Sequence, residues 1–534
     1  MAKAIIPLAP LPATARGWSK SIGTSAKDQQ LINGVYETNG KDVYVSKRSG
    51  SATSSTIGLS NIFVLTHYSS IFTTGFISVS TIFASTLPTN YGTLDAVVSG
   101  KNNFILADSV SGSIGILAWV TTSGTGWFLY SDAITTNFPT FTGDTHTNTV
   151  IDGITSTTGL YPGQAISGTG IAAGTRIATI TSATAITVTI ATTGTATVTI
   201  TKEAIAKVID ADFPSSVTSV VALNGRFFWS SGGNIYQSAL NDPSAYTAGE
   251  YIPADFAGDS IAFLFKVGQY IAAAGSRNTI QYFRYGQNSF GSVLSKVDEL
   301  TVLGLQLTSG PIDYAGIKYI LATPQDSGSD KSQKGLFRLS GLNSFERVSD
   351  DIMSSIIIDQ QYTRIGVGRM GDKTLLILHS SVATVLTLYD PSVNEFSFLT
   401  LSAALISSGG EFFTKASATS LFGWATNNTW TDSTVAFTLT AQTEPLLLNN
   451  GMGFTINYVD LIADIEASGT ATLSTSTDDG ATWTDIGTFD MTQNKKRINA
   501  GGFAPATTSL RVTHSANTGF RATKLIVDYT TSLT

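Results

Sequence analysis

Short runs of alternating apolar and polar residues, separated by turn residues, fill the stretch from about 217 to 287. The runs Ser219–Leu223, Arg226–Ser230 and Ile235–Ser238 follow one another, and Asn224-Gly225 separates the first two. Asn-Gly is typical of a tight hairpin, because the turn needs a positive φ at its centre that these residues adopt at little cost. The pattern predicts an antiparallel meander, and it restarts at 259–283 to give a second one.

Similar units follow at about 312–349 and 363–398, and others precede them at about 62–84 and 94–130. The distance between restarts is about 40–50 residues, which is the period of a propeller blade of three or four strands. No run shows the periodicity of an amphipathic helix longer than about 12 residues. The sequence therefore predicts an all-β chain that contains a β-propeller of about six small sheets.

Two regions differ from the blades. Residues 138–206 are mostly Thr, Ala, Gly and Ile and alternate strictly at 185–190 and 195–200. Such strands have one apolar and one hydroxyl face, which predicts a small β module inserted into a propeller loop. Alternating runs near the end predict a C-terminal β-sandwich. The predicted domains are an N-terminal arm with first strands (1–58), blades (59–137), the inserted module (138–206), further blades (207–440) and the sandwich (441–534).

Motifs in the blades and near the N-terminus resemble those of one protein family. The blade motifs include Asn224-Gly225-Arg226-Phe227-Phe228-Trp229, Asp242-Pro243, Gly275-Ser276-Arg277-Asn278-Thr279-Ile280 and Gly335-Leu336-Phe337-Arg338-Leu339. Near the N-terminus, 29–37 contains Leu31-Ile32-Asn33-Gly34, and 45–50 contains Lys47-Arg48-Ser49-Gly50, with Ser49 where that family usually has proline. Over 29–50 and 217–398 the chain resembles the head-to-tail stabilisation, or tail nozzle, proteins of short-tailed bacteriophages (tail tubular protein B-like, packaged DNA stabilisation).

The resemblance implies a structural virion protein rather than an enzyme. It implies a homohexameric ring that forms the tail nozzle below the portal and adaptor rings and anchors tail fibres or spikes. Double-stranded DNA would pass through its lumen without sequence-specific binding. The protein would be made in the host cytoplasm and reside in the virion tail. Within this picture the module at 138–206, which also resembles a β module of phage tail and fibre proteins, is surface decoration, a contact with another tail component or a tolerated insertion.

One compact motif suggests a different class of protein. Residues 476–483 match the Asp-box pattern S-x-D-x-G-x-T-W, carried here by Ser476, Asp478, Gly480, Thr482 and Trp483. In such a turn the carboxylate of Asp478 accepts backbone N–H groups, glycine supplies an unusual φ and tryptophan packs beneath. We interpret it as structural and expect Asp478→Ala to weaken folding without changing any activity. The alternatives are a glycan-binding or glycoside-hydrolysing propeller, which the Asp-box motivates, and a free adhesin, which the Thr-rich module motivates.

Composition narrows these classes. The chain carries 13% charged residues and a net charge of −7, which gives no global basic footprint for nucleic-acid binding. It has no cysteine, so disulfides and thiolate metal sites are excluded. The first twelve residues lack a signal-peptide core and predict an extended arm. Since no run of about 18 apolar residues occurs, the sequence predicts no membrane span.

Candidate catalytic and ligand-binding residues are few, and we expect no cofactor, metal or catalytic site. His67, His146, His379 and His514 show no metal-ligand spacing. The pairs Asp298-Glu299 and Asp350-Asp351 are candidates for general acid and base, with solvated turns as the favoured interpretation. The stretch 366–371 mimics a dinucleotide fingerprint and is predicted to be a turn, because no helix follows.

Basic residues gather at two places. An excess of lysine and arginine over 1–58 predicts a solvated strip or an arm that contacts an acidic neighbour or DNA phosphate. The run Lys495-Lys496-Arg497 predicts a solvated turn, with contact to an acidic partner as the alternative.

Overall fold

Strands make up almost all of the regular secondary structure in the computed structural model, and the one α-helix among the described residues is the nine-residue α1 (Asp351–Asp359). The structure describes residues 2–531 except 9–29, 39–41, 57–61, 66–74, 79–80, 85–89, 97–104, 111–113, 135–139, 255–259, 278, 287–291, 325–333, 343, 371–372, 380–385, 400–403, 406–409, 412, 418–419, 425–429, 433–434, 447, 449–452, 479 and 506–507. It forms two compact units: unit 1 comprises 1–56, 333–336 and 347–534, and unit 2 comprises 57–332 and 337–346.

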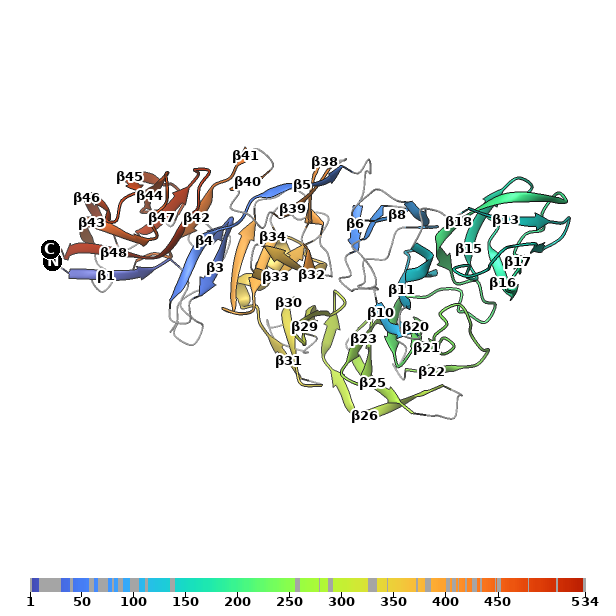
Figure 1. Cartoon of the computed structure of the whole chain (residues 1–534). Helices are drawn as coiled ribbons and strands as arrows, with labels where there is room; N and C mark the ends of the chain where they lie inside the picture. The colour runs from blue at the N-terminus through green and yellow to red at the C-terminus, as the bar shows by residue number, and fades with distance from the viewer. Residues whose placement is uncertain are drawn as a thin grey trace. The chain divides into compact units, whose positions relative to one another are not determined.

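Unit 2 is a series of small antiparallel sheets in chain order (Figure 1). Three are regular four-stranded meanders, and a fourth carries an extra strand. Their strands are β6 (Ile62–Leu65), β7 (Gly75–Ser78), β8 (Thr81–Ala84) and β9 (Asn90–Thr93); β19 (Ser219–Leu223), β20 (Arg226–Ser231), β21 (Asn234–Gln237) and β22 (Tyr251–Pro253); β23 (Ile261–Val267), β24 (Tyr270–Gly275), β25 (Thr279–Tyr285) and β26 (Leu294–Leu303); and β27 (Leu305–Leu307), β28 (Ile312–Tyr314), β29 (Ile317–Pro324), β30 (Gly335–Ser340) and β31 (Ser344–Arg347).

Alternate residues of one blade strand enter two different cores. In β19, Val220 packs with Trp229 in one cluster, whereas Val221 and Leu223 pack with Phe228 in another. The first core is shared with the preceding sheet and the second with the following one, so the sheet of β19–β22 is covered on both faces. This face-to-face stacking of consecutive meanders is the packing of propeller blades. The predicted fold class, all-β with β-propeller blades, is confirmed.

The hairpin that opens this pattern has the predicted chemistry. Asn224 and Gly225 have φ of 51° and 75°, the left-handed conformation that a two-residue turn between β19 and β20 requires. The register runs from Leu223 opposite Arg226 to Ser219 opposite Ser230.

The Thr-rich module is continuous with one blade through a shared strand. That blade contains β10 (Ile105–Val110), β11 (Ile114–Val120), β12 (Gly126–Tyr130) and the end of the twelve-residue β18 (Ala196–Lys207). The first half of β18 pairs instead with the module, whose strands are β13 (Thr140–Thr145), β14 (Val150–Asp152), β15 (Gln164–Gly168), β16 (Ile177–Ser182) and β17 (Ala185–Val188). These strands enclose a separate aliphatic core. One strand thus belongs to both blade and module.

Unit 1 combines further blade strands with a two-sheet sandwich. The blade strands are β32 (Arg364–Met370), β33 (Lys373–His379), β34 (Leu386–Asp390), β35 (Glu395–Leu399) and β37 (Gly410–Glu411), and a neighbouring sheet contains β5 (Ser51–Thr56), β36 (Ala404–Leu405), β38 (Phe413–Ser417), β39 (Ser420–Trp424), β40 (Thr431–Asp432) and β41 (Val435–Ala436). The sandwich strands are β42 (Leu439–Gln442), β43 (Phe454–Ala463), β44 (Thr470–Ser476), β45 (Thr484–Asp490), β46 (Lys496–Ala504), β47 (Ser509–His514) and β48 (Arg521–Thr531).

Strands from the start of the chain complete both sandwich sheets. In one sheet β2 (Gln30–Ile32) lies between β35 and β42, so the blade strands continue into the sandwich strands. In the other, β1 (Ala2–Pro7) and β4 (Val43–Lys47) both pair with β48, and β3 (Gly34–Thr38) pairs with β4. The two ends of the chain therefore lie side by side (Figure 1). The domain boundaries predicted above stay predictions.

Two local predictions are wrong. In the fingerprint-like stretch 366–371 the predicted turn is wrong for 366–370, because 364–370 form strand β32, which pairs along its length with β33; residue 371 lies outside the described residues. Asp350 is not a plain turn residue: it is the N-cap of α1, and its Oδ1 accepts the N–H of Met353 at 2.8 Å.

Candidate functional site

The Asp-box residues form a compact polar turn between β44 and β45. Ser476 Oγ accepts the N–H of Gly480 at 2.8 Å and donates to Asp478 Oδ1 at 2.8 Å. Asp478 also accepts the N–H of Thr482 at 2.9 Å and its hydroxyl at 2.5 Å. These hydrogen bonds, led by the one from Thr482, lower the pKa of Asp478 to about 2. Gly480 has a φ of 81°, which favours glycine.

The roles within this turn differ from the sequence-based expectation. Asp478 and the Thr482 amide are exposed, whereas the buried donor, the Gly480 N–H, is satisfied by Ser476. Trp483 is half-buried, and the guanidinium of Arg511 on β47 lies 4.2 Å from its ring centroid. The hydrogen bonds of the turn thus connect β44 to β45, and Trp483 connects them to β47 through Arg511.

The basic residues of the N-terminal motif are buried rather than solvated. Lys47 and Arg48 are 2% and 1% exposed. Both cations lie against the ring of Phe437, at 4.8 Å and 3.6 Å from its centroid, and Lys47 Nζ donates to Ala516 O at 2.7 Å. For these two residues the predicted solvated strip, or contact with DNA phosphate, is wrong. The predicted basic positions at 16, 20, 27 and 41 lie outside the described residues.

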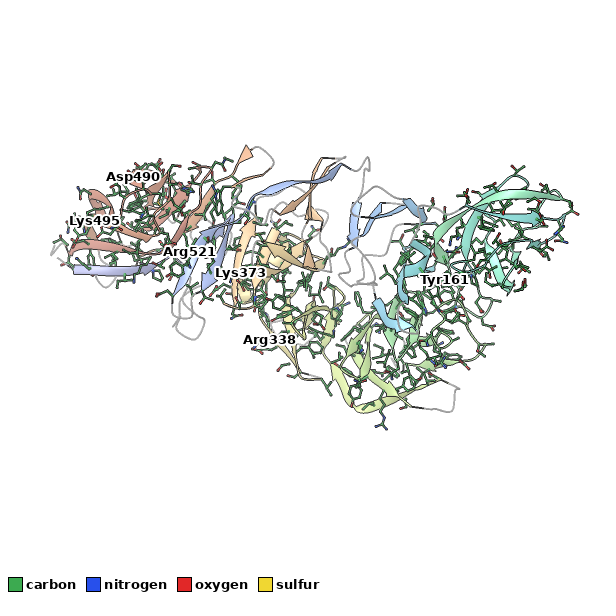
Figure 2. All side chains as sticks on the ribbon, in the orientation of Figure 1. Tyr161, Arg338, Lys373, Asp490, Lys495 and Arg521 are labelled. Carbon is green, nitrogen blue, oxygen red and sulfur yellow. The ribbon has the colours of Figure 1, made fainter. Side chains whose placement is uncertain are left out.

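Two other residues of the N-terminal motif, Asn33 and Glu37, connect residues 29–50 to the blade strands and the sandwich. Asn33, at a φ of 56°, donates its backbone N–H to Phe398 O at 2.8 Å and its side-chain Nδ2 to Thr438 O at 2.9 Å. Glu37 accepts from Arg521 at 2.7 Å, and Arg521, labelled in Figure 2, also reaches Asp464 at 3.1 Å. The motif that carries the family resemblance therefore joins blade strands to both sandwich sheets.

His514 lies in this buried region. Its side chain is fully buried on β47, and its ring centroid is 5.3 Å from that of Phe520. Burial, together with the nearby charge of Lys47, lowers the pKa of His514 to about 4. It is therefore neutral at pH 7.

The second basic run is also structural. Lys495 is exposed, but Lys496 is buried and its Nζ donates to Gln493 O at 2.8 Å and Ala463 O at 3.2 Å. Arg497 forms a two-pronged ion pair with Asp460, at 2.5 Å and 2.6 Å, and stacks on Tyr458 at 3.6 Å. The predicted solvated turn holds for Lys495 (Figure 2) and is wrong for Lys496, which is buried. Arg497 is exposed as predicted but lies in strand β46 rather than in a turn.

The structure does not bring the remaining candidates together. His146 Nε2 lies 2.9 Å from Asp152 Oδ1 in the module, remote in sequence from buried His514. The side chains of His67, His379, Asp298, Glu299 and Asp351 lie outside the described residues. Among the described residues, no group of three or more His, Asp or Glu side chains is arranged to hold a metal ion. Within the same ranges no helix combines the length and apolar character that crossing a membrane requires.

Sequence reasoning missed two polar clusters: one around Asp95, which contacts β12 and the blade end of β18, and one around Tyr161, which joins the module to that blade. Around Asp95, the carboxylate accepts from Lys207 at 2.8 Å, Thr125 at 2.9 Å and Trp127 Nε1 at 3.3 Å. Burial alone would raise the pKa of Asp95, but the hydrogen bond from Lys207 and those from Thr125 and Trp127 hold it below its ordinary value.

The second cluster involves Tyr161 (Figure 2), whose hydroxyl donates to Asp132 at 2.5 Å and whose ring stacks on Tyr130 at 3.8 Å. Buried Lys202 on β18 donates to Gly159 O beside it. The only sequence trace of these clusters is the set of charges at 202, 203 and 207, which interrupts an otherwise uncharged run. In both clusters the polar side chains contact one another, and the Tyr161 cluster holds the module against its blade.

Comparisons with known proteins add little. No model of a known protein family matches the chain, and no curated protein matches it. Among solved structures, BamB from Moraxella catarrhalis is 11% identical and aligns over 71% of this chain and 99% of its own, with a TM-score of 0.30. The WD40 β-propeller domain of Doa1 is 10% identical over 71% and 98%, with a TM-score of 0.30. An exo-β-1,3-galactanase from Phanerochaete chrysosporium is 11% identical over 80% and 95%, with a TM-score of 0.25. At such TM-scores these likenesses carry no argument about function.

Proposed function

We propose that this chain is a structural virion protein that forms the tail nozzle of a short-tailed bacteriophage. In this proposal it assembles into a homohexameric ring below the portal and adaptor rings, retains and conducts the packaged DNA, and anchors tail fibres or spikes. It acts in the virion tail after synthesis in the host cytoplasm, and it is not an enzyme. The observation that carries the proposal is the occurrence, in one chain, of the N-terminal motif and the blade motifs quoted above.

The positions of the motif residues support this proposal. Asn33 and Asn224 both take the positive φ that their turns need, and Lys47 and Arg48 are buried against Phe437. These four motif residues thus have structural roles, as expected of residues that specify an architecture rather than a reaction. Of the candidate acids and histidines whose side chains the structure describes, His146 contacts Asp152, His514 is buried beside Phe520, and Asp350 caps α1.

The net charge of the chain is compatible with a channel through which DNA slides. A wall dense in lysine and arginine would hold the genome, because each neutralised phosphate releases a counterion and strengthens binding. The net charge is −7, and among the described residues Lys47 and Arg48 are buried and Arg497 is paired with Asp460, so these three cations are not available to phosphate. We expect a neutral-to-acidic lumen wide enough for duplex DNA.

Electron cryomicroscopy of phage particles that carry this chain tests the proposal. A gold-binding tag inserted at Gly174, where an added Cβ would meet no atom within 4 Å, marks the module without disturbing the fold. A second tag at Gly249, which is equally open, gives an independent label in the blades. We expect both labels in sixfold rings around the tail axis, below the adaptor.

Several outcomes would overturn the proposal. The proposal is wrong if the labels lie away from the tail axis or if the ring lies elsewhere than below the adaptor. It is also wrong if lysine and arginine densely line the lumen. Hydrolysis of glycosides by the purified chain, abolished by a substitution that leaves it folded, would favour the glycosidase alternative. Binding of the isolated chain to cells or glycans, with no copy in the particle, would favour the lectin or adhesin.

A further inference from the structure

The N-terminal strand β1 is held to the rest of the protein mainly through its backbone. It pairs antiparallel with β48 from Ala2 opposite Tyr529 to Pro7 opposite Lys524. None of its six residues is buried, and Ile5 at its centre is 65% exposed. Among the described residues its other edge pairs with no strand. Such a strand contributes ladder hydrogen bonds but little hydrophobic burial, so it is only weakly fixed in place.

The residues of β48 that face β1 are nevertheless complementary to this particular segment. Lys3 lies directly opposite Asp528, which places opposite charges across the ladder, and Ile5 lies opposite Ile526. Just beyond the strand, Leu8 is 3% exposed and its N–H donates to Thr523 O at 3.0 Å. The complementary occupant of the β48 edge is therefore a strand with this charge, this apolar residue and this anchor, which is the N-terminus of a copy of this chain.

The chain connection permits that occupant to come from another molecule. β1 ends at Pro7 and β2 begins at Gln30, and a connection of that length can span several tens of ångströms at about 3.3–3.6 Å per extended residue. A strand that moves to a neighbour forms the same ladder, charge pair and anchor there, so the exchange loses no contact. In the proposed ring, neighbouring copies are also present at a fixed distance.

We propose that β1 is exchanged between copies: in the assembled protein, the N-terminal strand of one copy pairs with β48 of a second copy. This deepens the proposed ring assembly and rests on it for the presence of a neighbour. Each copy then gives one strand and receives one, which is a head-to-tail contact that closes when the rotation between copies closes. The exposed Ile5 and the open outer edge of β1 come to lie at the boundary between copies.

Cross-linking of two singly substituted chains tests the exchange. The chain has no cysteine, so Ile5→Cys and Ile526→Cys each introduce a single thiol, and opposite positions in a ladder are close enough for a disulfide or a short bis-maleimide. The two variants are mixed unfolded, refolded together and assembled, and the products are separated on a non-reducing gel. We expect a covalent dimer that contains one chain of each kind.

A matched control uses Ile462→Cys in place of Ile526→Cys. Ile462 is also exposed, but it lies on β43, on the far side of β48 from β1, so it should give no cross-link with Ile5→Cys. A second variant, Ala4→Pro in the Ile5→Cys chain, removes a ladder donor from the strand centre and should lower the yield of mixed dimer about tenfold.

The outcomes separate the exchange from the ring. If light scattering shows oligomers but mixed chains give no cross-link, while a chain with both cysteines links only within itself, the exchange is wrong and assembly stands. If no oligomer forms at any concentration or with particles present, the exchange is wrong as well. Cross-linked oligomers whose labels lie off the tail axis in particles would keep the exchange and overturn the proposed function.

Discussion

Unit 2 and unit 1 are both built from strands, but they are assembled in opposite ways. In unit 2 each meander pairs strands that follow one another, as in β19–β20–β21–β22. In unit 1 strands from the two ends of the chain meet: β1 and β4 pair with β48, and β2 pairs with β42. Pairing strands from the two ends of the chain closes a large loop, and the conformational entropy of that loop is lost before the contacts that offset it have formed. We therefore expect unit 1 to form later than the meanders of unit 2.

The two units also differ in what they bury. The cores between successive blades of unit 2 are apolar, with aromatic residues such as Trp229 and Phe228 at their centres. Unit 1 buries Lys47, Arg48, Lys496, Asp528 and neutral His514. Buried charges are tolerated only with partners in place, so stability in unit 1 depends on individual polar contacts and on pH, whereas in unit 2 it depends on packed volume.

The largest expected effect tests the packing of unit 2. Trp229→Ala empties a fully buried site beside Phe213, whose ring centroid lies 5.3 Å away, and should destabilise unit 2 by about 3–5 kcal/mol. Hydrogen exchange followed by mass spectrometry in increasing urea resolves peptides of the two units. The matched change Trp483→Ala, at a half-buried tryptophan of unit 1, should leave unit 2 peptides unaffected. Equal shifts of both units in either variant would mean that they unfold together.

The next effect is the pH dependence of unit 1. The pKa of His514 is lowered from 6.5 in the unfolded chain to about 4 in the folded protein. Between these values the unfolded chain binds a proton that the folded chain does not, so stability is full above about pH 6.5 and falls as pH decreases towards 4. The loss is at most about 3 kcal/mol at about 1.36 kcal/mol per pKa unit.

Urea unfolding of unit 1 at pH 7 and pH 5 measures this dependence. His514→Gln should flatten it, and Lys47→Met should weaken it, because the charge of Lys47 is part of what lowers the histidine pKa. An unchanged slope in His514→Gln would show that another group causes the dependence.

A smaller effect separates two adjacent lysines. Lys496→Ala removes the charged donor of Gln493 O and Ala463 O and should cost unit 1 about 1–3 kcal/mol. Lys495→Ala, one residue away and exposed, should change stability by less than about 0.5 kcal/mol. Thermal or urea unfolding of both variants checks this, and similar losses in both would contradict the assigned burial.

The smallest effect concerns the Asp-box turn. Ser476→Ala leaves the buried Gly480 N–H without its acceptor and should cost about 1–2 kcal/mol. Asp478→Ala removes hydrogen bonds to exposed groups and should cost less. Urea unfolding of unit 1 ranks the two, and a larger loss for Asp478→Ala would restore the expectation drawn from the sequence motif.

Local patterns explain what could be predicted at the candidate sites. The Asp-box was identifiable because the hydrogen bonds of its turn join residues 476–482, and the hairpin at Asn224-Gly225 because its φ requirement is local. The burial of Lys47 and Arg48 could not be predicted, because their partners Phe437 and Ala516 lie hundreds of positions away. From sequence alone a basic residue is predicted to be solvated, because a partner that is distant in the chain cannot be identified.

By itself the sequence determined the all-β class, the blade strands and the turns between them, since a two-residue period and glycine or asparagine at positive φ are properties of short segments. Only the tertiary structure decided that β18 serves both blade and module, that β2 joins the blade strands to the sandwich, and that β1 lies beside β48. These pairings depend on which distant edges meet, and strand edges offer the same N–H and C=O groups to many partners. Burial and the placement of opposite charges across a ladder choose among them, and both exist only in the folded protein.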